Sequence, residues 1–107
     1  MNYTEKILLV DDDKELLKVF KQIFIINDFN IEAVSNSLEA LEIVNSQKVA
    51  VVISDIIMPK IGGMELLSKI KEASPSTEVI MLTAEGSVSG AVEAVRRGAF
   101  TYMVKPA

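Results

Sequence analysis

Three adjacent carboxylates, Asp11, Asp12 and Asp13, follow an apolar run that is typical of a buried strand. A fourth acid, Asp55, closes a second apolar run. Two bare charges about 4 Å apart repel by roughly 4 kcal/mol at an effective dielectric constant near 20. If the fold brings Asp11, Asp12 and Asp55 together, they form an anionic site that a hard divalent cation would relieve. Mg²⁺ suits such oxygen ligands, because it needs only one or two protein carboxylates and keeps several waters.

Acids after a strand also have a simpler explanation, since they are frequent helix N-caps and turn formers. Asp13 has the position of an N-cap for the next helix. Thr83 and Lys105 follow two further apolar runs, and each alone is typical of an ordinary surface residue. Together, acids, a hydroxyl and an ammonium at four strand ends favour a site that handles a phosphoryl group. A cation and Lys105 would neutralise its oxygens, and Thr83 could donate a hydrogen bond.

Short apolar runs alternate with segments of helical period, and this pattern predicts the elements that position these residues. Continuous runs, as in strands covered on both faces, are residues 7–10, 49–53 and 79–82. Runs broken by polar residues, as in edge strands, are residues 31–34 and 100–104. Helices are expected at residues 14–26, after a capping box of Asn36 and Glu39, after Gly62-Gly63, and at about residues 87–97. Their apolar faces are expected at Leu16, Phe20, Ile23 and Phe24; Leu38, Leu41 and Val44; Leu66, Leu67 and Ile70; and Val88, Ala91, Val92 and Val95.

Alternating strands and helices with short loops predict an α/β fold with a parallel sheet. Placing the continuous strands at the centre gives the order 2-1-3-4-5, which is the flavodoxin-like doubly wound order. In this order, strands are added to one side of strand 1 and then, from strand 3 on, to the other side. A site is therefore expected at the carboxyl ends of strands 1 and 3, where this switch occurs. Helices 2 to 4 would cover one face and helix 1 the other, where a fifth helix is missing. We therefore expect residues 1–107 to be one domain of a longer chain, with an apolar strip exposed beside helix 1.

Composition excludes several function classes. The net charge of −4 and the isoelectric point near 4.8 argue against direct binding to nucleic acid or to anionic lipid. The chain has no cysteine and no histidine, so it lacks disulfides, thiolate metal sites and the commonest general base. No apolar run approaches the roughly 20 residues of a membrane span, and no secretory signal is present. A cytoplasmic domain is the expectation.

Four motifs resemble the receiver domain of two-component response regulators: "ILLVDDD", "VVISDIIMP", "VIMLTAEG" and "YMVKP". The resemblance implies that Asp55 is the phosphoacceptor and takes a phosphoryl group from a sensor histidine kinase or a phosphotransfer protein. It also implies that Asp12 and Asp55 hold Mg²⁺ directly, Asp11 through water, and the backbone carbonyl of Ile57 as a further ligand.

The same resemblance implies roles for residues around the phosphoacceptor. Lys105 would pair with the phosphoryl oxygens, and Thr83 and Tyr102 would be the switch pair. Phosphorylation would then change the surface of helix 4 and strand 5 and control an output domain, expected to act in transcription. The segment "GSVSGAVEAVRRGAFTYMVKP" resembles receivers of the nitrogen-regulation type. Self-association into a homodimer is a further expectation.

Three other functions fit parts of the pattern. A haloacid-dehalogenase-like phosphatase would use Asp11 as the nucleophile of an Asp-x-Asp motif, but Glu15 departs from that motif and Asp55 would have no role. A flavin or nucleotide module on the same fold needs glycines or hydroxyls after strand 1, where this chain has acids that repel phosphate. A degenerate receiver that serves only as an interaction surface is disfavoured, because Asp55, Thr83 and Lys105 are all present.

Overall fold

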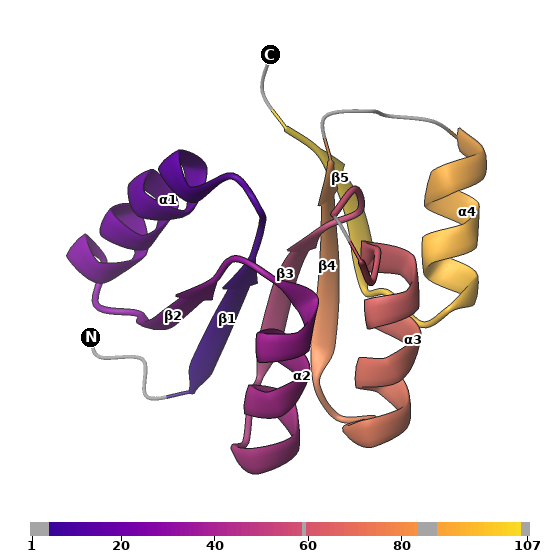
Figure 1. Cartoon of the computed structure of the whole chain (residues 1–107), viewed down its shortest axis with the longest axis horizontal. Helices are drawn as coiled ribbons and strands as arrows, with labels where there is room; N and C mark the ends of the chain where they lie inside the picture. The colour runs from indigo at the N-terminus through magenta and orange to yellow at the C-terminus, as the bar shows by residue number, and fades with distance from the viewer. Residues whose placement is uncertain (1–4, 59, 84–87, 106–107) are drawn as a thin grey trace.

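Strands and helices alternate along the whole chain (Figure 1). The computed structural model describes residues 5–58, 60–83 and 88–105. The strands are β1 (Lys6–Val10), β2 (Asn30–Val34), β3 (Val51–Asp55), β4 (Glu78–Thr83) and β5 (Thr101–Val104). The helices are α1 (Lys14–Ile26), α2 (Ser37–Ser46), α3 (Gly63–Ala73) and α4 (Val88–Arg96). All nine elements that the sequence predicts are present.

The five strands form one parallel sheet in the order β2-β1-β3-β4-β5 (Figure 1). The flavodoxin-like prediction is therefore confirmed, with the continuous apolar strands at the centre and the interrupted ones at the edges. Since all strands run the same way, their carboxyl ends meet at one edge of the sheet. None of the described helices combines the length and the apolar character that crossing a bilayer requires.

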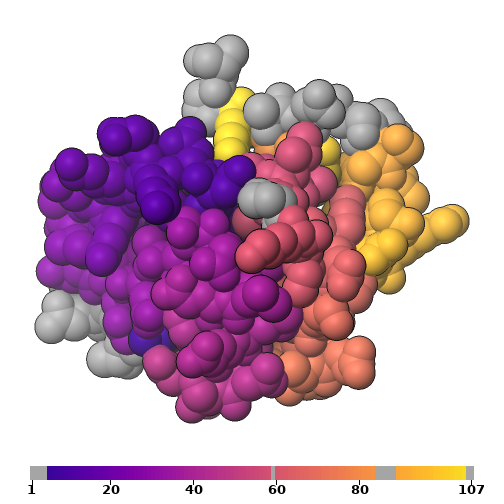
Figure 2. All heavy atoms as spheres, in the orientation of Figure 1, coloured from indigo at the N-terminus to yellow at the C-terminus, as the bar shows by residue number. Residues whose placement is uncertain are grey.

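The larger core lies between the sheet and the helices α2, α3 and α4. Alternate strand residues point into it, because successive side chains of a strand face opposite sides. The strands contribute Leu8, Val52, Val79 and Met81, and α3 contributes Leu66, Leu67 and Ile70, all of them buried. Figure 2 shows α2, α3 and α4 covering much of the face that is turned to the viewer. The predicted apolar face of the third helix is confirmed.

The opposite face of the sheet is covered by α1 alone and only in part. Leu9 of β1 and Leu17 of α1 are buried there, but Ile53 remains partly exposed although it lies in a central strand. The prediction that Ile23 belongs to the buried face is wrong, since half of this residue is exposed, as is Val19. Val19 and Ile23 thus leave apolar surface exposed on α1. The strip expected in the place of a fifth helix stays a prediction.

Other differences concern which face of a helix is buried. In α2 the predicted Leu38 is exposed, and Ala40 and Ile43 are buried in its place. In α4 the predicted Val92 and Val95 are exposed, and Ala94 is fully buried. The predicted faces were assigned by helical period alone, whereas close approach of a helix to the sheet favours a small side chain such as Ala40 or Ala94 at the contact. The predicted start of α4 at Ser87 lies outside the described residues.

The third strand begins two residues later than predicted and extends through Asp55. Val49 precedes it and is nevertheless buried, with its carbonyl oxygen accepting a hydrogen bond from the Thr77 hydroxyl at 2.7 Å. An apolar run thus marks burial more reliably than it marks where a strand begins. The strand ends at Asp55, as the sequence analysis expected of the site.

Candidate phosphoacceptor and metal site

The register of two central strands sets Asp11 beside Asp55. Val10 of β1 pairs with Ser54 of β3, so the residues that follow each of them lie side by side at the carboxyl edge of the sheet. The backbone N–H of Asp11 donates to the carbonyl of Val34 at 3.2 Å, which ties this residue to β2 as well. Asp11 is 6% exposed and Asp55 8% exposed. The two carboxylates are therefore held in place by the backbone and largely removed from water.

Asp12 completes the acidic cluster, and Asp13 does not belong to it. One carboxylate oxygen each of Asp11, Asp12 and Asp55 lies within 4.8 Å of the others, and Asp12 is exposed. The carboxylate of Asp13 instead accepts hydrogen bonds at 3.1 Å from the backbone N–H groups of Glu15 and Leu16, as the N-cap of α1. The prediction of three clustered acids followed by a cap is confirmed.

Lys105 reaches the cluster from the edge strand β5. Its backbone N–H donates to the carbonyl of Thr83 at 2.6 Å, which extends the pairing of β4 and β5 by one residue. Its Nζ atom then lies 2.7 Å from Oδ2 of Asp11 and 3.2 Å from Oδ2 of Asp55. The sequence analysis expected Lys105 at this site as a partner of phosphoryl oxygens, and the structure shows that its ammonium also bridges Asp11 and Asp55.

The pKa of Lys105 reflects this bridge. Burial by itself would lower the pKa of the ammonium, but the hydrogen bond and charge of Asp11, followed by those of Asp55, outweigh that effect. The pKa of Lys105 therefore lies above its usual value of 10.5. The ammonium stays charged at neutral pH and partly compensates the acids.

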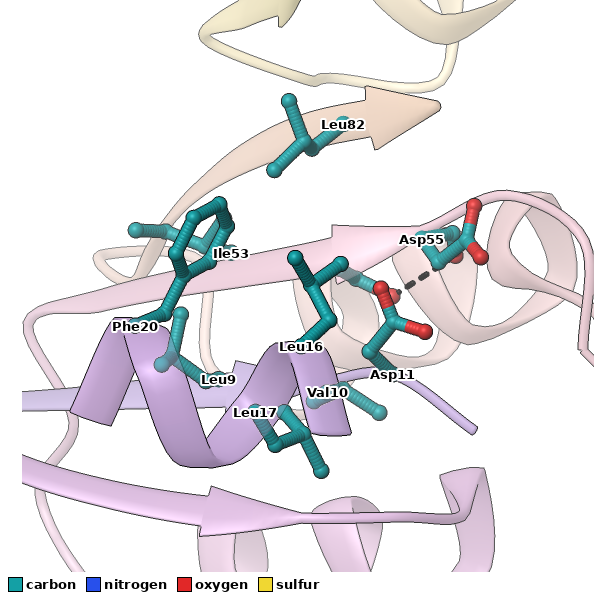
Figure 3. A pocket seen from close by; sticks show the side chains of 10 residues that line it. Leu9, Val10, Asp11, Leu16, Leu17, Phe20, Ile53, Asp55 and Leu82 are labelled. Carbon is teal, nitrogen blue, oxygen red and sulfur yellow. Dashed lines mark hydrogen bonds between the residues drawn. The ribbon is translucent and has the colours of Figure 1, made fainter. Parts of the chain in front are cut away.

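A small apolar hollow of about 10 Å³ lies next to these carboxylates (Figure 3). Asp11 and Asp55 line one end of it, and Leu16, Phe20 and Ile53 line the rest. Such a volume holds about one water-sized sphere. Because apolar side chains surround one side of the cluster, its charges are less well solvated there than they would be on an open surface.

The loop after β3 wraps around Asp55. The backbone N–H of Ile57 donates to Oδ1 of Asp55 at 3.3 Å, and the Ile57 side chain is 59% exposed. At the other end of the loop, a Cβ atom on Gly63 would overlap the carbonyl oxygen of Asp55 and lie 2.6 Å from Cα of Ile56. The sequence suggested Gly62-Gly63 only as a helix start. The structure shows that Gly63 allows α3 to approach the end of β3.

The two predicted switch residues lie on neighbouring strands near this cluster. Thr83 is buried at the carboxyl end of β4, one position beyond Leu82, which pairs with Asp55. Tyr102 of β5 pairs with Met81 and packs partly buried against the larger core. The structure thus brings Asp11, Asp12, Asp55 and Lys105 into one cluster, with Thr83 at the adjoining strand end and Tyr102 three residues before Lys105.

The acidic cluster fits a hard divalent cation by the chemistry of its donors. All three side chains offer carboxylate oxygens, which Mg²⁺ prefers. One carboxylate oxygen of each acid lies within 4.8 Å of the others, so a single ion could be held by more than one of these side chains.

Comparison with known proteins identifies relatives over almost the whole chain. Residues 7–107 match the family described as "Response regulator receiver domain". The transcriptional regulatory protein GlrR of Escherichia coli is 38% identical over 100 residues, which are 94% of this chain and 22% of that protein. The chain therefore spans about a fifth of the length of GlrR and of several other curated relatives. Such relatives bear out the expected similarity to the nitrogen-regulation type.

Solved structures share the fold. A receiver domain protein from Clostridium thermocellum has a TM-score of 0.88 and 38% identity, covering 96% of this chain and 83% of that one. A chain of the CheX–CheY–BeF₃–Mg²⁺ complex from Borrelia burgdorferi has a TM-score of 0.89 and 33% identity, covering 96% of this chain and 79% of that one.

Proposed function

This chain belongs to the response regulator receiver domain family, and from that premise we propose that it is a signalling switch whose phosphoacceptor is Asp55. The observation that carries the proposal is the cluster of Asp11, Asp12 and Asp55 with the ammonium of Lys105 2.7–3.2 Å from two of them. Aspartate is a weak nucleophile that becomes effective when opposite charge neutralises the phosphoryl oxygens it approaches.

The proposed reaction is an in-line transfer from a phosphohistidine of a sensor kinase or phosphotransfer protein. A carboxylate oxygen of Asp55 forms a bond to phosphorus while the bond from phosphorus to the histidine nitrogen breaks, and the electron pair of that bond leaves with the imidazole. Lys105 already lies 3.2 Å from Asp55, so a small movement would bring its ammonium to the phosphoryl oxygens. Thr83, at the adjoining strand end, would donate its hydroxyl hydrogen bond to the same group.

Mg²⁺ is the proposed metal, held by Asp12 and Asp55 directly, by Asp11 through water and by the backbone carbonyl of Ile57. When bound, it would supply positive charge to the oxygens of the transferred group. Support comes from the donor set and from the relative in Borrelia burgdorferi, whose complex contains Mg²⁺. The cluster keeps one exposed member, Asp12, which leaves the site open to the ion.

Thr83 and Tyr102 are proposed to pass the change to the surface of α4 and β5. The support is positional, since Tyr102 lies on β5, which contacts α4, and Thr83 lies on β4, which pairs with β5. In the full-length protein this surface would control an output domain, because relatives such as GlrR are transcriptional regulators several times longer than this chain. A homodimer remains part of the proposal.

The decisive experiment is incubation with a small phosphoryl donor and Mg²⁺, followed by mass-spectrometric mapping of the modified residue. We expect one added phosphoryl group on Asp55, and none on Asp55→Asn. The phosphatase alternative predicts instead that Asp11→Asn abolishes labelling and that Asp55→Asn does not. Labelling at Asp11, or undiminished labelling of Asp55→Asn, would refute the proposal.

A further inference from the structure

The loop between β3 and α3, residues 56–62, carries Ile57 and is anchored to the rest of the fold at a few points. The N–H of Gly63 donates to the carbonyl of Ile56 at 2.7 Å and closes the base of the loop. Met58 is buried in the larger core. Between these anchors Lys60 adopts a left-handed backbone conformation with φ of 65°. In the described part of the loop, these contacts link it to the rest of the fold.

Ser37 provides a contact from a different part of the chain. Its hydroxyl donates to the carbonyl oxygen of Ile61 at 2.7 Å, across 24 positions of sequence. Ser37 is 2% exposed, and a hydroxyl buried to this extent needs a hydrogen-bond partner, which the carbonyl of Ile61 supplies. A hollow of about 330 Å³ lies beside the contact, lined in part by Leu38 and Lys60, so α2 and the loop are not densely packed here. The hydrogen bond is therefore a specific link between α2 and the loop.

The start of α2 does not need this hydroxyl. Asn36 is the N-cap, and its side-chain oxygen accepts the N–H of Glu39 at 2.8 Å. The hydroxyl of Ser37 leaves its own helix and stabilises the neighbouring loop instead. This separates its contribution from the ordinary capping of a helix.

We infer that Ser37 is a positioning residue for the metal site: through Ile61 it holds the β3–α3 loop, and with it the backbone carbonyl of Ile57, where a divalent cation beside Asp55 can reach it. The inference rests on the proposed function, which assigns that carbonyl to the metal. A ligand held in place before the ion arrives loses less conformational freedom on binding. Residues that orient metal ligands commonly affect affinity by about 10- to 100-fold.

The test compares Mg²⁺ binding to Ser37→Ala and to Ser46→Ala by isothermal titration calorimetry. Ser46 is a matched control, because it lies in the same helix and its hydroxyl donates to Glu42 of its own helix at 2.9 Å. We expect Ser37→Ala to weaken Mg²⁺ binding roughly tenfold, at the low end of that range, and Ser46→Ala to leave it unchanged. Ser37→Thr, which keeps the hydroxyl, should restore most of the affinity.

Circular dichroism would establish that each variant is folded, and Ser37→Cys would replace Ser37→Ala if the latter does not fold, since a thiol is similar in size and a weak donor. Wild-type affinity in a folded Ser37→Ala or Ser37→Cys protein would overturn the inference. A different result, no Mg²⁺ binding by the wild type, would count against the proposed function instead. In that case, hydrogen exchange measured without metal would test whether Ser37 positions the loop. Faster exchange of the Gly63 amide in Ser37→Ala than in Ser46→Ala would support the positioning role. Equal exchange in the two variants would refute it.

Discussion

The Nζ atom of Lys105 lies 2.7 Å from Oδ2 of Asp11, although 94 positions of sequence separate the two residues. This ion pair is largely buried and places positive charge where the acidic cluster would also attract a metal ion. The ammonium has two opposite effects. It stabilises the metal-free fold, and it competes electrostatically with any cation that binds beside it.

Substituting Lys105 by methionine should therefore lower stability and raise Mg²⁺ affinity. The buried acids would lose their counter-charge, and we expect a loss of about 2 kcal/mol in the free energy of unfolding. Without the competing ammonium, Mg²⁺ should bind roughly tenfold more tightly, equivalent to about 1.4 kcal/mol. Urea unfolding and calorimetric titration measure the two quantities. Lys69→Met is the control, because Lys69 makes a long, exposed ion pair with Glu65 at 4.0 Å and no other ion pair among the described residues. Weaker Mg²⁺ binding by Lys105→Met would contradict the competition.

Mg²⁺ should raise the melting temperature of the wild type through the carboxylate cluster. A ligand at ten times its dissociation constant stabilises the folded state by about 1.4 kcal/mol, which corresponds to several degrees for a domain of this size. The shift should disappear in the double variant Asp12→Ala, Asp55→Ala, as followed by circular dichroism. An equal shift in that variant would place the ion elsewhere.

Asp13 should matter for stability and not for the metal. Replacing it by alanine removes the two N-cap hydrogen bonds at the start of α1, which typically costs about 1 kcal/mol. Its carboxylate is outside the acidic cluster, so the Mg²⁺ dissociation constant should stay the same. Chemical unfolding together with titration separates these effects. A tenfold change in Mg²⁺ affinity with unchanged stability would reverse the roles that we assign to the adjacent acids.

Gly63→Ala should destabilise the protein, whereas Gly62→Ala should have little effect. A Cβ atom on Gly63 would overlap backbone atoms at the end of β3, and such overpacking costs about 1–3 kcal/mol. At Gly62 the nearest atom to a new Cβ would be 3.6 Å away, an ordinary contact. Urea midpoints of the two variants check the contrast. Equal midpoints would mean that the loop moves aside at little cost.

The sequence was sufficient to predict the topology and the members of the cluster, because both follow from patterns that persist along the chain. Strand ends rich in acids, and the order that places continuous strands at the centre, bring Asp11 and Asp55 together without any atomic detail. Leu17 and Ala94 show what such patterns miss. Each is buried although the sequence analysis placed other residues of its helix on the buried face, since helical periodicity gives a broad stripe and not the line of closest contact.

Contacts that join distant segments could not be predicted in the same way. Neither the hydrogen bond from Ser37 to Ile61 nor the bridge from Lys105 to Asp11 leaves a local signal in the sequence. Serines at the start of a helix usually serve as caps. Only the folded structure shows that the hydroxyl of Ser37 donates to a neighbouring loop instead. The steric role of Gly63 could not be predicted either, because a glycine at the start of a helix can serve several purposes and the sequence does not show which neighbour it approaches.

The closing of the acidic cluster by the last strand has a consequence for the order of events during synthesis. A ribosome delivers Asp11, Asp12 and Asp55 well before residue 105, so an emerging chain carries the acids long before their counter-ion. The ion pairs of Lys105 with Asp11 and Asp55 can form only after β5 has left the exit tunnel and joined the sheet. Cleavage that detaches that final strand would leave a remnant with every acidic ligand and no resident ammonium.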